Sequence, residues 1–220
     1  MREGEGGESE PPDSRESEAY ADILGRYANT PKGRGRVMQA LGHALDIIAE
    51  KGIEPLSLRE VARRCGITVG NLQHYFDSRH SLLDAVLAYL ARQYDVNYSG
   101  IDQSGDARQR FENVIRYLLK DIRSPRTNAV FFELWAFANR DPGAAEILAG
   151  AYRHHLANLE RLILEMSGST DPAAAARKAI LVAAMIEGLM VFMAQRSHLD
   201  FDADEIERLC MGQIMAVATD

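Results

Sequence analysis

Apolar residues recur at spacings of three and four along most of this chain, which is the pattern of amphipathic helices. Beyond Gly100 no segment alternates as a half-buried strand does. The pattern predicts an all-α protein of about nine helices. The predicted helices cover residues 34–51, 58–65, 69–76, 78–94, 106–122, 128–140, 144–166, 172–196 and 203–217.

Two short helices near the N-terminus carry clear end signals. Ser57 and Glu60 have the spacing of a capping box, in which a hydroxyl and a carboxylate satisfy the first free amides of a helix. Gly66 supplies a residue that tolerates the left-handed turn ending that helix. Thr68 is then placed to cap the next helix, which contains Leu72. The spacing predicts two helices that cross at a tight turn.

Several Pro-containing dipeptides are interpreted as breaks between the later helices: Ser124-Pro125, Asp141-Pro142 and Asp171-Pro172. The helix over residues 128–140 is apolar on most sides, so we expect it to be buried nearly all round. The most apolar segment, residues 179–194, is too short for a membrane span and carries Glu187 in its middle, which predicts a buried helix.

Charge is unevenly distributed along the chain, whose formal net charge is -7. Residues 1–18 are rich in Gly, Glu, Ser and Pro and carry seven acids against two arginines. Such a segment buries too little apolar surface to order itself. Residues 34–79 are net positive, which places any contact with DNA phosphates there. We therefore predict an acidic, disordered tail over 1–33, a helix-turn-helix domain over 34–80 and a larger domain over 81–220.

Other classes of protein find little support in the sequence. Cys65 and Cys210 are far apart and give neither a disulfide framework nor a metal-ligand spacing, so we expect buried, reduced thiols and predict no metal or cofactor. No phosphate-binding glycine loop, HExxH pattern or nucleophile elbow is present, which argues against an enzyme and against catalytic residues. A DNA-bending architectural protein would be basic, whereas the pI here is about 5.4. No secretory signal or membrane span is predicted, and the cytoplasm is the expected compartment.

The second short helix presents a polar face suited to base edges and phosphates. With its apolar residues turned inward, the outward side chains lack carboxylates. An ordinary corner between two helices is the alternative, because helix-Gly-helix alone is weak evidence. The outward set is Thr68, Val69, Asn71, Gln73 and His74.

The segment from Ile67 to Phe76, followed by Ser78-Arg79 and Leu82-Leu83, resembles the signature of the TetR family of transcriptional regulators. The resemblance covers residues 34–83 and implies an N-terminal helix-turn-helix and a helical effector-binding domain. It implies a pseudo-palindromic double-stranded DNA operator, a homodimer formed by the last two helices, and a repressor released by a small organic effector.

The resemblance also implies roles for single residues. Phosphate contacts fall on Ser57, Tyr75 and Arg79. Groove-facing positions fall on Arg59, Val69, Gly70, Asn71, Gln73 and His74. Gln73 departs from the family, which usually has Tyr there, and an amide is able to pair with adenine. For Arg59, the alternative to a guanine contact is a solvated charge on the surface of the helix.

Candidate effector residues lie in the larger domain, where the family encloses an apolar cavity. They are Phe131, Glu133, Trp135, Tyr152 and Glu187. The alternative is that Glu133 meets a basic residue such as Arg126 and that Glu187 lies at the dimer seam. His154 and His155 are neighbours that point in different directions along a helix, so we expect packed or hydrogen-bonded roles for them instead of metal ligation. The last two helices could equally form core within one chain.

Overall fold

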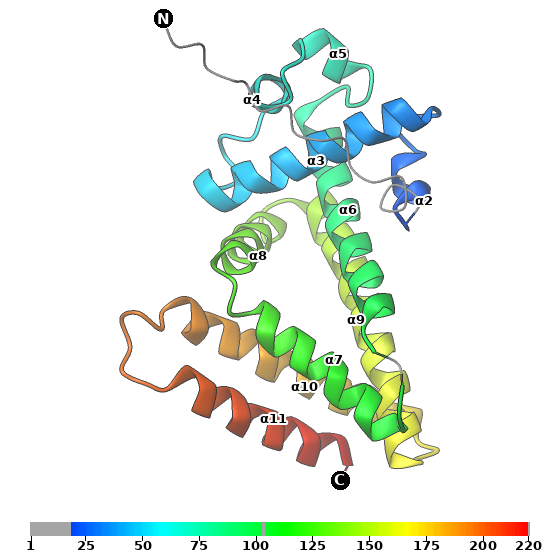
Figure 1. Ribbon diagram of the computed structural model, residues 1–220, viewed down its shortest axis with the longest axis vertical. Coiled ribbons are helices and arrows are strands. Elements are labelled where there is room, and N and C mark those ends of the chain that lie inside the picture. Colours follow the sequence, from blue (N-terminus) through cyan, green and yellow to red (C-terminus); the bar gives the residue numbers. More distant parts are fainter. Residues whose placement is uncertain (1–18, 103, 220) are drawn as a thin grey trace, which may run out of the picture. The chain divides into compact units, whose positions relative to one another are not determined.

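The computed structural model describes residues 19–102 and 104–219, and this part of the chain is helical without any strand (Figure 1). The predicted all-α class is confirmed. The structure has ten helices in the described residues, one more than the sequence predicts. They are α2 Ala21–Leu24, α3 Pro31–Lys51, α4 Leu58–Arg64, α5 Val69–Gln73, α6 Arg79–Gly100, α7 Ala107–Asp121, α8 Pro125–Ala138, α9 Pro142–Ser167, α10 Pro172–Ala194 and α11 Ala203–Thr219.

The additional helix, α2, lies in the range predicted to be a disordered tail. Tyr20 is 4% exposed, and its ring centroid lies 4.9 Å from that of Tyr89. Arg92 Nε donates to the Ala19 carbonyl at 3.0 Å. Residues 19–33 are therefore ordered, whereas the sequence predicts disorder there, because apolar side chains in this range pack against the rest of unit 1. Residues 1–18, the rest of the predicted tail, lie outside the described residues.

Four of the described helices, α3, α8, α9 and α10, begin with proline, where the missing N–H has no helical partner to lose. The preceding residue caps each helix with its side chain: Ser124 accepts from the Thr127 amide at 3.3 Å, and Asp141 from the Ala144 amide at 2.9 Å. Asp171 caps α10 in the same way. These dipeptides are helix starts as well as breaks, and α8 consequently begins three residues before its predicted start.

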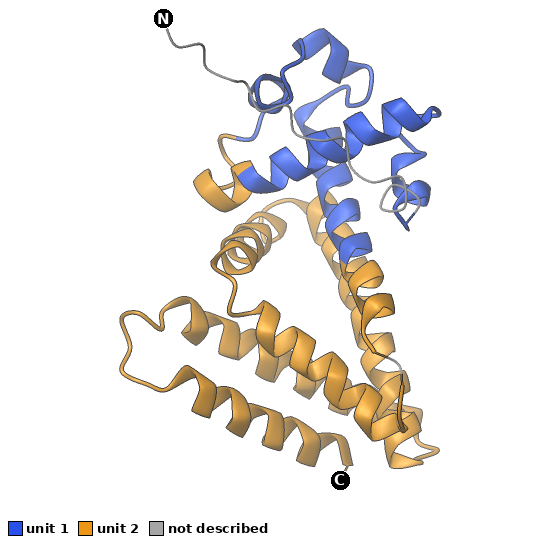
Figure 2. Ribbon diagram, viewed as in Figure 1, with its two compact units in different colours: residues 1–46, 56–93 blue, residues 47–55, 94–220 orange. Residues whose placement is uncertain are grey.

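The chain divides into two compact units, coloured in Figure 2. Unit 1 comprises residues 1–46 and 56–93, and it contains α2, α4, α5 and most of α3. Apolar side chains from each of these helices and from the start of α6 are buried in it. They include Leu24, Val37, Leu41, Val61, Leu72, Phe76, Leu83 and Val86.

Unit 2 comprises residues 47–55 and 94–220. Its hydrophobic core is built by α7, α9, α10 and α11, with buried residues such as Phe111, Ile115, Leu159, Ile163, Val182, Met193 and Ile214. Helices α3 and α6 each contribute residues to both units. The division of the chain at residues 33/34 and 80/81 that the sequence predicts is not tested by these two units and remains a prediction.

One side of α10 is exposed, although the sequence predicts a buried helix there. Ala179, Val182 and Met193 are buried, whereas Ile180 and Phe192 are 55% and 56% exposed. No helix in the described ranges is long and apolar enough to cross a membrane.

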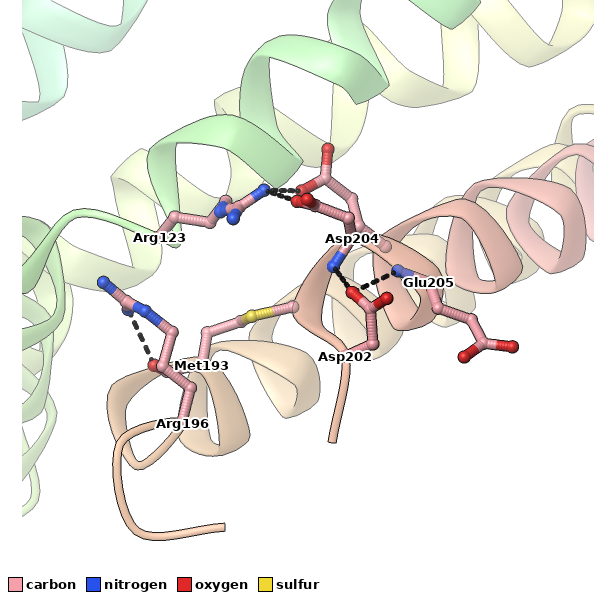
Figure 3. A network of polar contacts seen from close by, with 7 residues as sticks. Arg123, Met193, Arg196, Asp202, Asp204 and Glu205 are labelled. Carbon is pink, nitrogen blue, oxygen red and sulfur yellow. Dashed lines mark hydrogen bonds and ion pairs between the residues drawn. The ribbon is translucent and has the colours of Figure 1, made fainter. Parts of the chain in front are cut away.

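The start of α11 is fixed by a polar network at the end of α7 (Figure 3). The Arg123 guanidinium contacts the carboxylates of Asp204 and Glu207. Asp202 caps α11 by accepting from the amides of Asp204 at 2.9 Å and Glu205 at 3.2 Å. These contacts hold α11 in register with the rest of unit 2.

Both cysteines are free thiols. They are half-buried, more accessible than the sequence predicts. Burial raises the pKa of the Cys65 thiol to about 11, which keeps it protonated and poorly nucleophilic at neutral pH.

Candidate nucleic-acid interface and effector site

Helices α4 and α5 meet at the turn that the sequence predicts. Ser57 Oγ accepts from the Glu60 amide at 3.2 Å, and Thr68 Oγ1 accepts from the Asn71 amide at 3.2 Å. Gly66 lies between the helices with a φ of +65°, a left-handed conformation that glycine adopts without strain. The local geometry is that of a helix-turn-helix.

The second helix separates a buried face from a polar, exposed one. Leu72 and Phe76 are fully buried. Val69 and Tyr75 are half-buried, and α5 ends at Gln73, so Tyr75 and Phe76 follow the helix instead of belonging to it. The residues that are both exposed and predicted to contact DNA are Thr68, Gly70, Asn71, Gln73 and His74, together with Arg59 on α4.

Two of the predicted phosphate contacts also hold the protein's own backbone. Ser57 uses its hydroxyl as the α4 cap. Arg79 Nε donates to the Leu56 carbonyl at 2.8 Å, which ties the start of α6 to the residue before that cap. Both side chains are half-buried, so they fix the position of the unit's polar surface.

Four of the five predicted effector residues come together in unit 2. Trp135 Nε1 donates to Tyr152 Oη at 2.8 Å, and Tyr152 hydrogen-bonds the Glu187 carboxylate. The Phe131 ring centroid lies 5.8 Å from that of Trp135. The Phe132 ring centroid also lies 5.8 Å from that of Trp135. Phe132 therefore belongs to the same cluster, although it is not among the predicted effector residues. We call Phe131, Phe132, Trp135, Tyr152 and Glu187 the aromatic-carboxylate cluster.

The carboxyl group in this cluster sits in a poorly hydrated setting. Burial raises the pKa of Glu187, and the hydrogen bond from Tyr152 partly opposes that shift. The pKa of Tyr152 is raised, first by burial and then by the Glu187 charge. Glu187 makes no ion pair within the part of the chain that the structure describes, and a nearby positive charge would stabilise its ionised form.

Glu133, the fifth predicted effector residue, lies elsewhere. Its carboxylate accepts from the Ile53 amide at 2.9 Å. Successive residues of an α-helix are about 100° apart around the axis, so Glu133 lies about 160° round α8 from Trp135. The structure thus separates Glu133 from the cluster. Its observed partner is a backbone amide, whereas the sequence analysis proposed Arg126 as the alternative partner.

Asn128 is a buried polar residue that the sequence analysis misses. It is 3% exposed, and its side-chain amide has no hydrogen-bond partner among the described residues. Seven residues separate it from Trp135, which places the two on the same side of α8. The signal in the sequence was an amide in the first turn of an otherwise apolar helix, spaced at i, i+3, i+4 and i+7 with Phe131, Phe132 and Trp135.

Away from the aromatic-carboxylate cluster, residues of α6, α7 and α9 line a hollow of about 260 Å³. His154 Nε2 lies 2.8 Å from Asp95 Oδ1, and Tyr98 Oη lies 2.7 Å from His155 Nδ1. Burial lowers the pKa of His155 to about 4. Each histidine thus has a protein partner, and no group of metal-ligating residues occurs in the part of the chain that the structure describes.

Together, the capped helices, the glycine turn and the exposed polar face define a DNA-binding protein of the helix-turn-helix class. Residues 41–86 match the family model for bacterial regulatory proteins of the tetR family. Residues 107–219 match that of the BetI-type transcriptional repressor, C-terminal. The chain belongs to the TetR family of transcriptional regulators, which are not enzymes.

Curated relatives carry the names of transcriptional regulators. The repressor KstR2 of Rhodococcus jostii is 27% identical over 126 residues, which are 46% of this chain and 62% of that protein, less than two thirds of its length. The regulator BetI of Rhizobium meliloti is 27% identical over 156 residues, covering 70% of this chain and 75% of that protein.

Solved structures show the same fold. A transcriptional regulator from Rhodococcus sp. Rha1 has a TM-score of 0.69 at 24% identity, over 82% of this chain and 95% of its own. A regulator from Saccharomonospora viridis, crystallised in complex with choline, has a TM-score of 0.67 at 17% identity, over 81% of this chain and 94% of its own. At this identity the likeness concerns the fold alone.

Proposed function

We propose that this TetR-family protein is a repressor that binds a pseudo-palindromic operator as a homodimer and is released from it by a small organic cation. The aromatic-carboxylate cluster carries the proposal. Aromatic faces attract cations through their quadrupole, and a desolvated carboxylate adds charge attraction. The choline complex of the Saccharomonospora viridis regulator supports this ligand class for a similar fold.

Operator recognition falls to the exposed face of α5. Gln73 is exposed beyond the buried Leu72, and its amide offers the donor and acceptor that pair with adenine N7 and N6. Asn71 lies on the same helix, and His74 is the residue directly after its end. Arg79 and Ser57 would hold phosphates through groups that also fix the protein backbone, so they position the reader.

Replacement of Gln73 tests this assignment. We expect Gln73→Ala to cost about 1–3 kcal/mol in operator binding and to relax the preference at one base pair per half-site, because one bidentate contact is lost. Arg79→Ala is the comparison: it should weaken binding to all sequences alike and lower the salt slope by about one. Selection of binding sites from random duplexes, followed by salt titration, measures both effects. An unchanged selected site in Gln73→Ala would show that Gln73 is not a base reader.

Switching is proposed to act through α6, which begins at Arg79 beside the helix-turn-helix and continues to Gly100 in unit 2. Two recognition helices must lie about 34–36 Å apart to enter successive major grooves. A small tilt of α6 in both subunits would misplace them. A nearly complete switch requires about 5.5 kcal/mol of preferential effector binding to the DNA-incompetent state, a demand shared by two sites in a dimer.

The effector assignment is tested with two variants of the cluster. We expect Trp135→Ala to abolish release of operator DNA by choline or benzyltrimethylammonium while leaving operator affinity without ligand nearly intact. Glu187→Gln should weaken the binding of these cations more than that of neutral analogues, because it removes charge and keeps shape. Fluorescence anisotropy of labelled operator gives the first readout, and calorimetry gives the second.

The matched control is Phe137→Ala, which removes another half-buried aromatic ring of α8 outside the cluster. Normal release of DNA by a cation in Trp135→Ala would place the effector site elsewhere. Binding of neither cation to the parent protein would reject this ligand class.

A further inference from the structure

We infer that Glu133 is a coupling residue, through which movement of α8 is transmitted to the segment that enters the helix-turn-helix. This inference rests on the proposed effector response. It concerns how a movement caused by a ligand at the aromatic-carboxylate cluster is transmitted to other parts of the chain. The contact between Glu133 and the end of α3 carries it. The two groups are 80 residues apart in sequence and are joined by one hydrogen bond of 2.9 Å, from Ile53 N to Glu133 Oε2.

The end of α3 is shaped to receive this carboxylate. Gly52 has a φ of +81°, and its amide closes α3 by donating to the Ile48 carbonyl at 3.0 Å. The next amide, that of Ile53, donates to Glu133. A Cβ at Gly52 would lie 3.1 Å from Glu133 Oε2, closer than side chains normally approach. The positive φ therefore favours glycine at this position, and any larger residue would displace the Glu133 carboxylate.

The hydrogen bond is protected from water. Ile53 is 1% exposed, and Glu133 is half-buried. A buried amide N–H that is left without an acceptor destabilises the folded state, so this hydrogen bond favours keeping the two groups together. Ile53 and Glu133 should therefore move together when either helix moves.

The contact lies directly before the DNA-reading elements along the chain. Three residues, Glu54, Pro55 and Leu56, separate Ile53 from the Ser57 cap of α4. This connection has little conformational freedom. The φ angle of Pro55 is fixed by its ring. Leu56 is 1% exposed, and its carbonyl accepts a hydrogen bond from Arg79 Nε. A displacement of Ile53 would thus be passed on to the start of α4 instead of being absorbed in the connection.

The same helix carries the effector cluster on its other side. Trp135, Phe131 and Phe132 lie within two residues of Glu133, and Trp135 bonds to α9 through Tyr152. Helix α8 is one unbroken helix of 14 residues, whose backbone hydrogen bonds link its two sides. A ligand that turns the Trp135 side of α8 must therefore move the Glu133 carboxylate by a comparable arc.

The experiment uses the full-length protein and needs no effector, so its failure differs from failure of the cation proposal. Coupling is reciprocal, and binding of operator DNA must therefore alter α8. Trp135 is the only tryptophan in the chain and reports directly on that helix. We would bind a duplex obtained by site selection, and record Trp135 emission and amide hydrogen exchange over residues 128–138.

Four variants give the comparison with the parent protein. Glu133→Ala removes the acceptor, Glu133→Gln keeps an uncharged acceptor, and Gly52→Ala obstructs the approach from the opposite side. Gly168→Ala is the matched control, because Gly168 also has a left-handed φ, +64°, but no atom lies within 4 Å of a Cβ placed there. It reproduces the backbone strain without touching the contact.

We expect operator binding to change emission and exchange in the parent protein and in Gly168→Ala. The change should fall at least fivefold in Glu133→Ala and Gly52→Ala, and less in Glu133→Gln. A residue that serves only as a helix cap would lower the melting temperature without altering this response. No response in the parent, or an undiminished response in Glu133→Ala or Gly52→Ala, would overturn the inference. If Glu133→Ala does not fold, the isosteric Glu133→Gln and the Gly52→Ala variant decide it.

Discussion

Phe192→Asp is expected to convert the protein into a monomer and to lower its affinity for the operator by about 100-fold or more. Phe192 is 56% exposed on α10, so its replacement should not disturb the fold of the chain itself. In the proposed dimer this ring becomes buried, and an aspartate placed there would lose its hydration without gaining a partner. A single subunit contacts only one half-site of the operator. The monomer therefore loses the increase in affinity that comes from binding two linked half-sites at once.

The surface around Phe192 has the character of a pairing face. Positions 180, 181, 184, 188, 191 and 192 fall within about 120° of one another around α10. Ala184 and Gly188 lie between the larger apolar residues and would let a second helix approach closely. Leu209, 58% exposed on α11, adds to the apolar surface. A contiguous exposed apolar surface of this kind marks an interaction site.

Sedimentation equilibrium and operator titration measure the two expected effects. Leu199→Asp is the control, since Leu199 is also exposed, at 41%, but follows α10 in the connection to α11. It should leave both the dimer and operator binding close to the parent values. Persistence of the Phe192→Asp dimer at micromolar concentration would place the dimer interface on another surface.

Phe76→Ala should destabilise the helix-turn-helix by about 3–5 kcal/mol, the range for removing a fully buried aromatic side chain. Phe76 has no exposed surface, and its ring centroid lies 5.2 Å from that of Tyr27. Its amide also donates to the Leu72 carbonyl at 3.0 Å, so the ring anchors the chain directly after α5. Against a total stability of about 5–15 kcal/mol, this loss would leave much of the DNA-reading element unfolded at 37 °C.

The two compact units need not unfold together, so the effect is best measured locally. Amide hydrogen exchange over residues 58–76 gives the local opening free energy, while Trp135 emission follows unit 2. Phe76→Leu, which retains most of the volume, should cost less than about 1.5 kcal/mol. A cost below about 1 kcal/mol for Phe76→Ala would mean that α5 does not depend on this ring.

The sequence by itself determined the helix-turn-helix, because every signal for it is local. A hydroxyl three residues before an amide, a glycine at a left-handed turn and inward apolar residues act within a few residues of one another. The structure confirms Ser57 and Thr68 as helix caps, Gly66 as the left-handed turn and Leu72 as a core residue. The sequence also marks the aromatic and acidic residues of the larger unit, because they stand out within apolar helices.

Only the tertiary structure decided which of those residues meet. Trp135, Tyr152 and Glu187 come from three helices, and their contact depends on how α8, α9 and α10 pack. Glu133 is two residues from Trp135, yet it bonds to Ile53, because residues two positions apart on an α-helix lie about 160° apart around its axis. The order of residues 19–33 was likewise decided by long-range burial, such as that of Tyr20 against Tyr89. Periodicity predicts that a face is buried, whereas the identity of its neighbour follows from packing.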